Sequence, residues 1–98
     1  MVNKQYDKQK SKCKVTFTLP SSLKAATAAV VGDFNNWDRH ATMMKRQPDG
    51  TWKSELTLDC GKEYHFRYLI NGREWHNEWE ADRYAVHPLG GENSVLMI

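Results

Sequence analysis

The segment EYHFRYLI at residues 63–70 runs directly into Asn71-Gly72, and this combination constrains the fold more than any other feature of the chain. In an extended strand, the alternating apolar residues fall on one face: Tyr64, Phe66, Tyr68 and Ile70. Arg67 falls on the opposite, polar face. The Asn-Gly pair favours the two-residue turns of antiparallel hairpins. The segment therefore predicts a half-buried strand of an antiparallel sheet.

Other segments repeat this pattern, with turn residues such as Pro48-Asp49-Gly50 between them. Further strands are indicated by KVTFTL (14–19), ATAAVVG (26–32), TWKSELTL (51–58) and the terminal NSVLMI. No segment sustains an apolar period of 3.6 residues, and 21–29 is the only plausible short helix. Short strands at fairly regular intervals are typical of an antiparallel sandwich or a small barrel. We expect an all-β, antiparallel β-sandwich.

The length of 98 residues fits one domain with a modest core. It leaves no room for a parallel eight-stranded enzyme barrel, which needs roughly 250 residues. The net charge of +2 is too small to indicate a polyanionic partner by itself. The charge is uneven, because the first fourteen residues hold five lysines and one aspartate. We expect residues 1–13 to be a basic, frayed tail and residues 14–98 to be the folded domain.

Two features bear on location. The basic start has no apolar core typical of a signal peptide, and no run is long enough to cross a membrane. Cys13 and Cys60 lie far apart, without the spacing of a zinc site or redox motif. We expect a reduced cysteine pair and a cytoplasmic location.

Three motifs in order carry a family resemblance: GDFNNWDRHATMMKRQPDGTW, GKEYHFRYLINGREW and HPLGGENSV. Over roughly 14–98 the chain resembles carbohydrate-binding module family 48, the glycogen-binding or isoamylase amino-terminal type. The resemblance implies an early-set, immunoglobulin-like β-sandwich. Members bind α-1,4-linked glucans, as in the β-subunits of AMP-activated protein kinase, and others precede catalytic barrels in branching and debranching enzymes. It therefore implies a non-catalytic glycogen-, starch- or maltodextrin-binding module without a cofactor.

The resemblance also implies the site. The tryptophan that closes FNNW stacks on a sugar ring, which gives Trp37, and the tryptophan after the hairpin gives Trp75. A basic residue on the preceding strand binds sugar hydroxyls, which gives Arg67. A leucine and an asparagine near the end complete the site, which gives Leu89 and Asn93. Aromatic faces suit the apolar side of a pyranose, and Arg and Asn suit its hydroxyl rim.

The chain departs from the kinase-type pattern at two places. Arg73 and Glu74 separate Gly72 from Trp75, one residue more than in the kinase-type hairpin, so the alignment could slip by one. Gly91 stands where those modules carry a threonine near the glucan.

Each aromatic residue also has a structural interpretation. Trp52 lies on the apolar face of a strand, which favours core packing, and Phe34 is a better core anchor than Trp37. Core packing remains an alternative for Trp37 and Trp75. Trp79 has three interpretations: a third platform for a sugar ring, a plug over the edge of the core, or a contact in an oligomer. The neighbouring asparagines of FNNW are expected to shape their loop.

Other function classes fit the sequence less well. The acidic residues Glu74, Glu78, Glu80 and Asp82 cluster in one segment, but a small sandwich offers no deep cleft for glycoside hydrolysis. The histidines lack the spacing of a metal site, so we expect no bound metal. For want of a catalytic cleft we expect no enzyme activity, and we expect no cofactor. A protein-interaction or dimerisation module without sugar binding is the main alternative, and a single-stranded nucleic-acid binder is a weaker one. We expect a glucan ligand, with a glucan-metabolising enzyme or a second copy as possible partners, and neither nucleic acid nor membrane.

Overall fold

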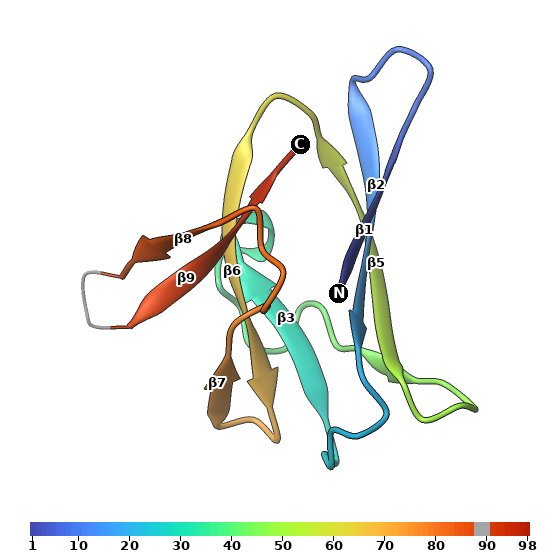
Figure 1. Cartoon of the computed structure of the whole chain (residues 1–98), viewed down its shortest axis with the longest axis vertical. Coiled ribbons are helices and arrows are strands. Elements are labelled where there is room, and N and C mark those ends of the chain that lie inside the picture. The colour runs from blue at the N-terminus through green and yellow to red at the C-terminus, as the bar shows by residue number, and fades with distance from the viewer. Residues whose placement is uncertain (88–90) are drawn as a thin grey trace.

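The computed structural model describes residues 1–87 and 91–98. Their strands form two antiparallel sheets that face each other (Figure 1). The first sheet has the order β1 (Val2–Tyr6), β2 (Lys12–Leu19), β5 (Trp52–Asp59), β4 (Lys45–Arg46). The second has the order β3 (Ala28–Gly32), β6 (Glu63–Ile70), β9 (Glu92–Met97), β8 (Arg83–Val86), and β7 (Glu74–His76) also pairs with β6. The expected all-β sandwich is confirmed.

The core lies between the sheets and comes from the alternating residues of the strands. In β2 every second residue is buried, from Cys13 to Leu19. Phe17 packs edge-on against Phe66 of the opposite sheet, with ring centroids 5.2 Å apart. The predicted inward face of β6 is confirmed, because Phe66, Tyr68 and Ile70 all belong to the main buried cluster. Trp52 is buried in the same cluster, as expected.

The expectation of a frayed tail at residues 1–13 is wrong. Residues 2–6 form β1, which pairs with β2 over five positions, from Val2 opposite Phe17 to Tyr6 opposite Cys13. The intervening turn needs no glycine because Lys10 adopts a φ of 55° and the Asp7 carboxylate accepts hydrogen bonds from the Ser11 amide and hydroxyl, each at 2.9 Å. β2 correspondingly begins at Lys12.

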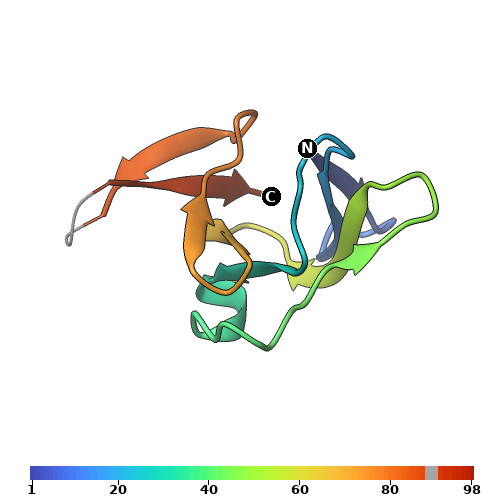
Figure 2. The same ribbon diagram turned by 90° about the horizontal axis from the view of Figure 1, so that it is seen from below.

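The short helix considered for 21–29 does not form. A turn follows Pro20, where the Leu23 amide donates to the Pro20 carbonyl at 3.2 Å, and the chain enters β3 at Ala28. The helical turn in this region is instead η1 (Asp33–Asn35), a 3-10 turn directly after β3, on the outer side of the second sheet (Figure 2).

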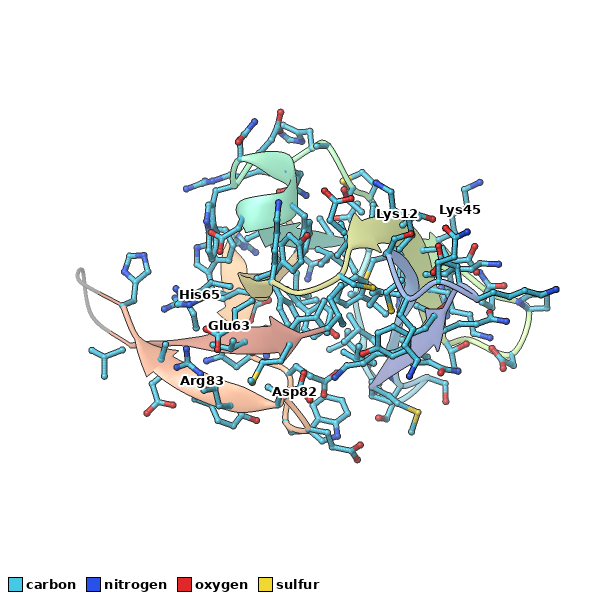
Figure 3. The ribbon with its side chains drawn as sticks, turned by 90° about the horizontal axis from the view of Figure 1, so that it is seen from above. Lys12, Lys45, Glu63, His65, Asp82 and Arg83 are labelled. Atoms are coloured by element: carbon cyan, nitrogen blue, oxygen red, sulfur yellow. The ribbon has the colours of Figure 1, made fainter. Side chains whose placement is uncertain are left out.

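Charged side chains occupy the outer faces (Figure 3). Lys12 pairs with Asp59 on the first sheet. On the second sheet, the Arg83 guanidinium lies 2.6 Å from the Glu63 carboxylate. Among the described residues, no helix is long and apolar enough to span a membrane. The outer face of the second sheet also carries the aromatic residues considered next.

Candidate functional site

A groove of about 350 Å³ lies on the outer face of the second sheet. Its described lining residues come from β6, β7, the loop after η1 and the segment after β8: Trp37, Arg39, Arg67, Trp75 and His87. Three residues that the sequence predicted for the site, Trp37, Arg67 and Trp75, therefore meet in one place. They are separated in sequence, and the antiparallel pairing of β3, β6 and β7 brings them together.

The loop that carries Trp37 is held by Asn35. The Asn35 side-chain amide donates to the Val30 carbonyl at 2.9 Å and to the Thr42 hydroxyl at 3.0 Å. Its Oδ1 accepts from the Gly32 amide at 3.1 Å. Asn36 follows in the left-handed region, with a φ of 56°. The two asparagines therefore shape the loop, as the sequence predicted.

Trp37 is half-buried and serves two purposes at once. One part of it packs against a small apolar cluster on the outer face of the sheet, formed by Ala29, Val31 and Leu69. Its Nε1 donates to Asp33 Oδ1 at 2.9 Å, which fixes the ring about its side-chain torsions. The alternatives of platform and packing are thus not exclusive, because a ring that rests on the sheet can still line the groove.

Trp75 reaches the groove through the register of the hairpin. It lies directly opposite Leu69 in the β6–β7 pair, so the two side chains share the outer face. The Trp75 side chain is 38% exposed. The Arg39 guanidinium carbon lies 5.5 Å from the centroid of the Trp75 ring, within the range of a cation–π contact.

Arg67 is supported from behind by Asn93. Arg67 Nε donates to Asn93 Oδ1 at 2.8 Å, between the adjacent strands β6 and β9. Asn93 is only 5% exposed, and its Nδ2 lies 3.5 Å from His65 Nδ1. Among the described residues Asn93 is not part of the groove lining, so its geometry is that of a residue that orients Arg67. Its predicted contact with sugar stays a prediction.

Gly91 explains how the guanidinium fits. It has a φ of 74°, and a Cβ built on it would lie 3.3 Å from Nη2 of Arg67. The absence of a side chain here leaves room for Arg67. Leu89, the fifth predicted site residue, lies outside the described residues.

Two lining residues were missed by the sequence interpretation. Arg39 lies two residues after Trp37, in the loop, and His87 follows β8, with its ring centroid 6.5 Å from that of Trp37. Neither lies in a strand with a readable alternation, so no sequence signal marked them as neighbours of Trp37 and Trp75.

The comparison with protein families decides the relationship. The family described as carbohydrate-binding module 48 (isoamylase N-terminal domain) matches residues 5–85. The chain belongs to this family. The family 48 module is 41% identical over 76 residues to the 1,4-alpha-glucan branching enzyme of Synechococcus sp. (strain CC9902), covering 74% of the module and 10% of that enzyme. It is 41% identical over 63 residues to the enzyme of the same name from Bordetella pertussis, covering 62% of the module and 8% of the enzyme.

A third relative is the 1,4-alpha-glucan branching enzyme of Thermosynechococcus vestitus, 33% identical over 64 residues, which are 64% of the module and 8% of the enzyme. The module thus spans about a tenth of the length of the curated relatives it matches. The described residues form the two-sheet module and no catalytic domain.

The remaining candidates of the module lie away from the groove. Trp79 is 59% exposed and borders a small apolar cavity of about 80 Å³ at the core edge, together with Leu19 and Leu23. Of the acidic cluster, Glu78 is fully buried and accepts a hydrogen bond from the Tyr68 hydroxyl, while Asp82 binds Lys4. Within 1–87 and 91–98 no group of three His, Cys, Asp or Glu side chains could hold a metal ion.

Proposed function

We propose that this module binds α-1,4-glucan chains, without catalysis, in the groove between Trp37 and Trp75. The observation that carries the proposal is the convergence of Trp37, Arg67 and Trp75 on one groove. The sequence motifs point to these residues independently of the geometry, and they come from three separate elements. The curated relatives are named for 1,4-alpha-glucan branching, which supports the same class of ligand.

The chemistry of the groove fits a sugar. A pyranose ring has an apolar C–H face, against which a rigid indole packs at low entropic cost. Its rim of hydroxyls accepts hydrogen bonds from a guanidinium such as that of Arg67. Two indoles in one groove would engage successive sugars of a curved α-glucan. The site is shallow, so affinities in the millimolar to micromolar range, roughly −4 to −8 kcal/mol, are expected.

The proposal includes the biological setting. The module would act alone or bring a glucan-metabolising enzyme to the polymer, and glycogen, starch and maltodextrin all present the required chain. A cytoplasmic location agrees with the two free cysteines, Cys13 and Cys60. Neither nucleic acid nor membrane is a proposed partner.

A titration with β-cyclodextrin, followed by tryptophan fluorescence and by calorimetry at low and high salt, tests the proposal. We expect saturable binding that changes little with salt, since stacking and neutral hydrogen bonds are weakly screened. Trp75→Ala should weaken binding at least tenfold while the protein stays folded. Trp79→Ala removes a more exposed tryptophan that does not line the groove and should bind like the parent.

Absence of binding up to several millimolar β-cyclodextrin, in folded protein, would overturn the proposal. Equal losses in Trp75→Ala and Trp79→Ala would overturn the assignment of the groove. Sedimentation of the same samples then distinguishes the alternative, a dimer that depends on Trp79.

A further inference from the structure

The described lining of the groove is rich in hydrogen-bond donors and poor in acceptors. Besides the two indoles it contains two guanidinium groups and one imidazole, and no described lining residue is Asp or Glu. A guanidinium donates and never accepts. A sugar hydroxyl both donates and accepts, so a groove built only for neutral sugar would be expected to offer acceptors as well.

Two side chains that accept hydrogen bonds from residues of the site, Asn93 and Asp33, are already engaged. Asn93 Oδ1 accepts from Arg67 Nε. Asp33 Oδ1 accepts from the Trp37 indole at 2.9 Å, and Asp33 Oδ2 accepts from the His65 amide at 2.8 Å. Asn93 and Asp33 therefore hold lining residues in place, and these three of their oxygens already accept hydrogen bonds within the module.

Arg39 places positive charge over the ring of Trp75. Its side chain is exposed, and its contact in the structure is the cation–π contact with Trp75. Across the described residues Arg39 makes no ion pair. The charge therefore lies over the Trp75 ring, where an incoming sugar phosphate would meet it, and no carboxylate from the described part of the module neutralises it.

We propose that the groove recognises an α-glucan that carries a phosphate monoester, with Arg39 as the residue that binds the phosphate. This inference rests on the proposed function, because the glucan supplies the ring that stacks on Trp75. A phosphate monoester carries a charge of about −1.5 to −2 and three strong acceptor oxygens. A guanidinium binds such oxygens with two parallel hydrogen bonds, which balances the excess of donors in the groove. Arg67 is the second guanidinium within the same lining.

The test compares maltoheptaose carrying one 6-phosphate ester with the same oligosaccharide after phosphatase treatment, by calorimetry. We expect about tenfold tighter binding of the phosphorylated form at low salt, as for one charge-assisted contact, and a smaller ratio at high salt because salt screens an exposed ion pair. Arg39→Gln should remove most of the ratio. Arg39→Lys, which keeps charge but not the planar fork, should retain part of it.

Arg46→Gln is the matched control. Arg46 is an exposed arginine on β4, in the other sheet, so its loss changes the net charge equally and should leave the ratio unchanged. If Arg39→Gln and Arg46→Gln lower the affinity ratio equally, net charge explains the preference for the phosphorylated form and the inference is overturned.

Competitors identify the source of the phosphate. Inorganic phosphate and a single-stranded oligonucleotide, each at the concentration of the phosphorylated oligosaccharide, should compete poorly because neither presents a pyranose to Trp75. Competition as strong as that of the phosphorylated oligosaccharide would overturn the inference. Equal binding of phosphorylated and neutral maltoheptaose would also overturn it while the proposed function stands, whereas failure of β-cyclodextrin to bind would remove the proposed function first.

Discussion

Arg67 Nε donates a hydrogen bond to Asn93 Oδ1 at 2.8 Å, from β6 to the neighbouring strand β9. Asn93 is almost completely buried, while Arg67 reaches the groove. The bond therefore ties a long, flexible side chain to the rigid part of the sheet. A guanidinium held in this way loses less entropy when it binds a ligand, so we expect Asn93 to contribute to affinity through Arg67.

Asn93→Ala should weaken glucan binding about threefold to tenfold. It removes the acceptor of Arg67 Nε and so frees the guanidinium to adopt other rotamers. We also expect a loss of about 1 kcal/mol in the free energy of unfolding, because a hydrogen bond of a buried side chain is lost. β-Cyclodextrin titration and urea unfolding measure the two effects.

The matched control for Asn93 is Asn3→Ala, an exposed asparagine on β1 in the other sheet, which should change neither quantity. Unchanged affinity of Asn93→Ala would mean that Arg67 is positioned by other contacts.

Gly91→Ala should reduce both stability and glucan affinity. Its φ of 74° is unfavourable for alanine, at a cost of about 1–2 kcal/mol in the free energy of unfolding. In addition, the new Cβ would lie 3.3 Å from Arg67 Nη2 and would displace the guanidinium.

Gly61→Ala separates these effects. Gly61 has a φ of 78°, but no atom lies within 4 Å of the position that the new methyl group would take, so the substitution carries the backbone cost without the displacement. Urea unfolding should give similar losses for both variants, and only Gly91→Ala should bind β-cyclodextrin more weakly. Equal affinities of the two variants would contradict the role given to Gly91.

The sequence predicted the part of the fold that depends on local alternation. In β6 the period of two assigns Phe66 and Tyr68 to the core and Arg67 to the outer face, and the structure has the same assignment. Asn71-Gly72 likewise lies in the β6–β7 hairpin, but Ile70 pairs with Glu74, so the connection holds three residues and not the two expected. Such features are readable because the strand period and the turn act over a few residues.

Features without a local sequence signal were not readable. β1 looks like a basic tail because its turn to β2 holds neither glycine nor proline, although the two strands are neighbours in sequence and pair as a hairpin. Contacts between residues far apart in sequence were equally hidden. Lys4 illustrates this, because its ammonium group binds Asp82 at 2.7 Å, which is 78 residues away. Arg39 lies in the loop after η1 and contacts Trp75 on β7, so its place in the groove depends on the folded arrangement and not on a local pattern.

Asn35→Ala should destabilise the loop that carries Trp37. It removes three hydrogen bonds, to Gly32, Val30 and Thr42, at a cost of about 1–3 kcal/mol in the free energy of unfolding. Trp37 would then lose its fixed position and β-cyclodextrin affinity should fall. Chemical unfolding and the fluorescence titration check the two results.

The neighbouring Asn36→Gly provides the comparison for Asn35. Asn36 has a φ of 56°, which glycine adopts readily, so this variant should lie within about 0.5 kcal/mol of the parent. A loss in Asn36→Gly as large as in Asn35→Ala would assign the effect to the backbone and not to the side-chain bonds.

Tyr68 connects the core to a buried carboxylate. Its hydroxyl donates to Glu78 Oε1 at 3.0 Å, and both side chains are fully buried. Glu78 also accepts from the Glu80 amide at 3.0 Å and pairs with the Met1 amino group. Burial first, and then the Glu78 carboxylate, raise the pKa of the Tyr68 phenol above its ordinary range.

This raised pKa predicts a loss of stability in alkali. Above about pH 10 the phenol of the unfolded chain releases its proton while the folded protein keeps it, so ionisation stabilises the unfolded state relative to the folded state. Tyr68 alone should lower the free energy of unfolding by about 1.4 kcal/mol per pH unit until the folded phenol ionises too. Tyr68→Phe should be less stable at pH 7, by about 1–3 kcal/mol, since Glu78 loses a buried donor.

Tyr68→Phe should at the same time show a shallower decline above pH 10, because phenylalanine has no proton to release. Urea unfolding at pH 7 and at intervals from about pH 9 to 11.5, which bracket the ordinary pKa of a phenol, measures both effects. Tyr6→Phe removes an exposed hydroxyl and should follow the parent at every pH. Parallel alkaline declines in the parent and in Tyr68→Phe would contradict the prediction, because groups common to both proteins, such as the lysines, would then account for the whole slope.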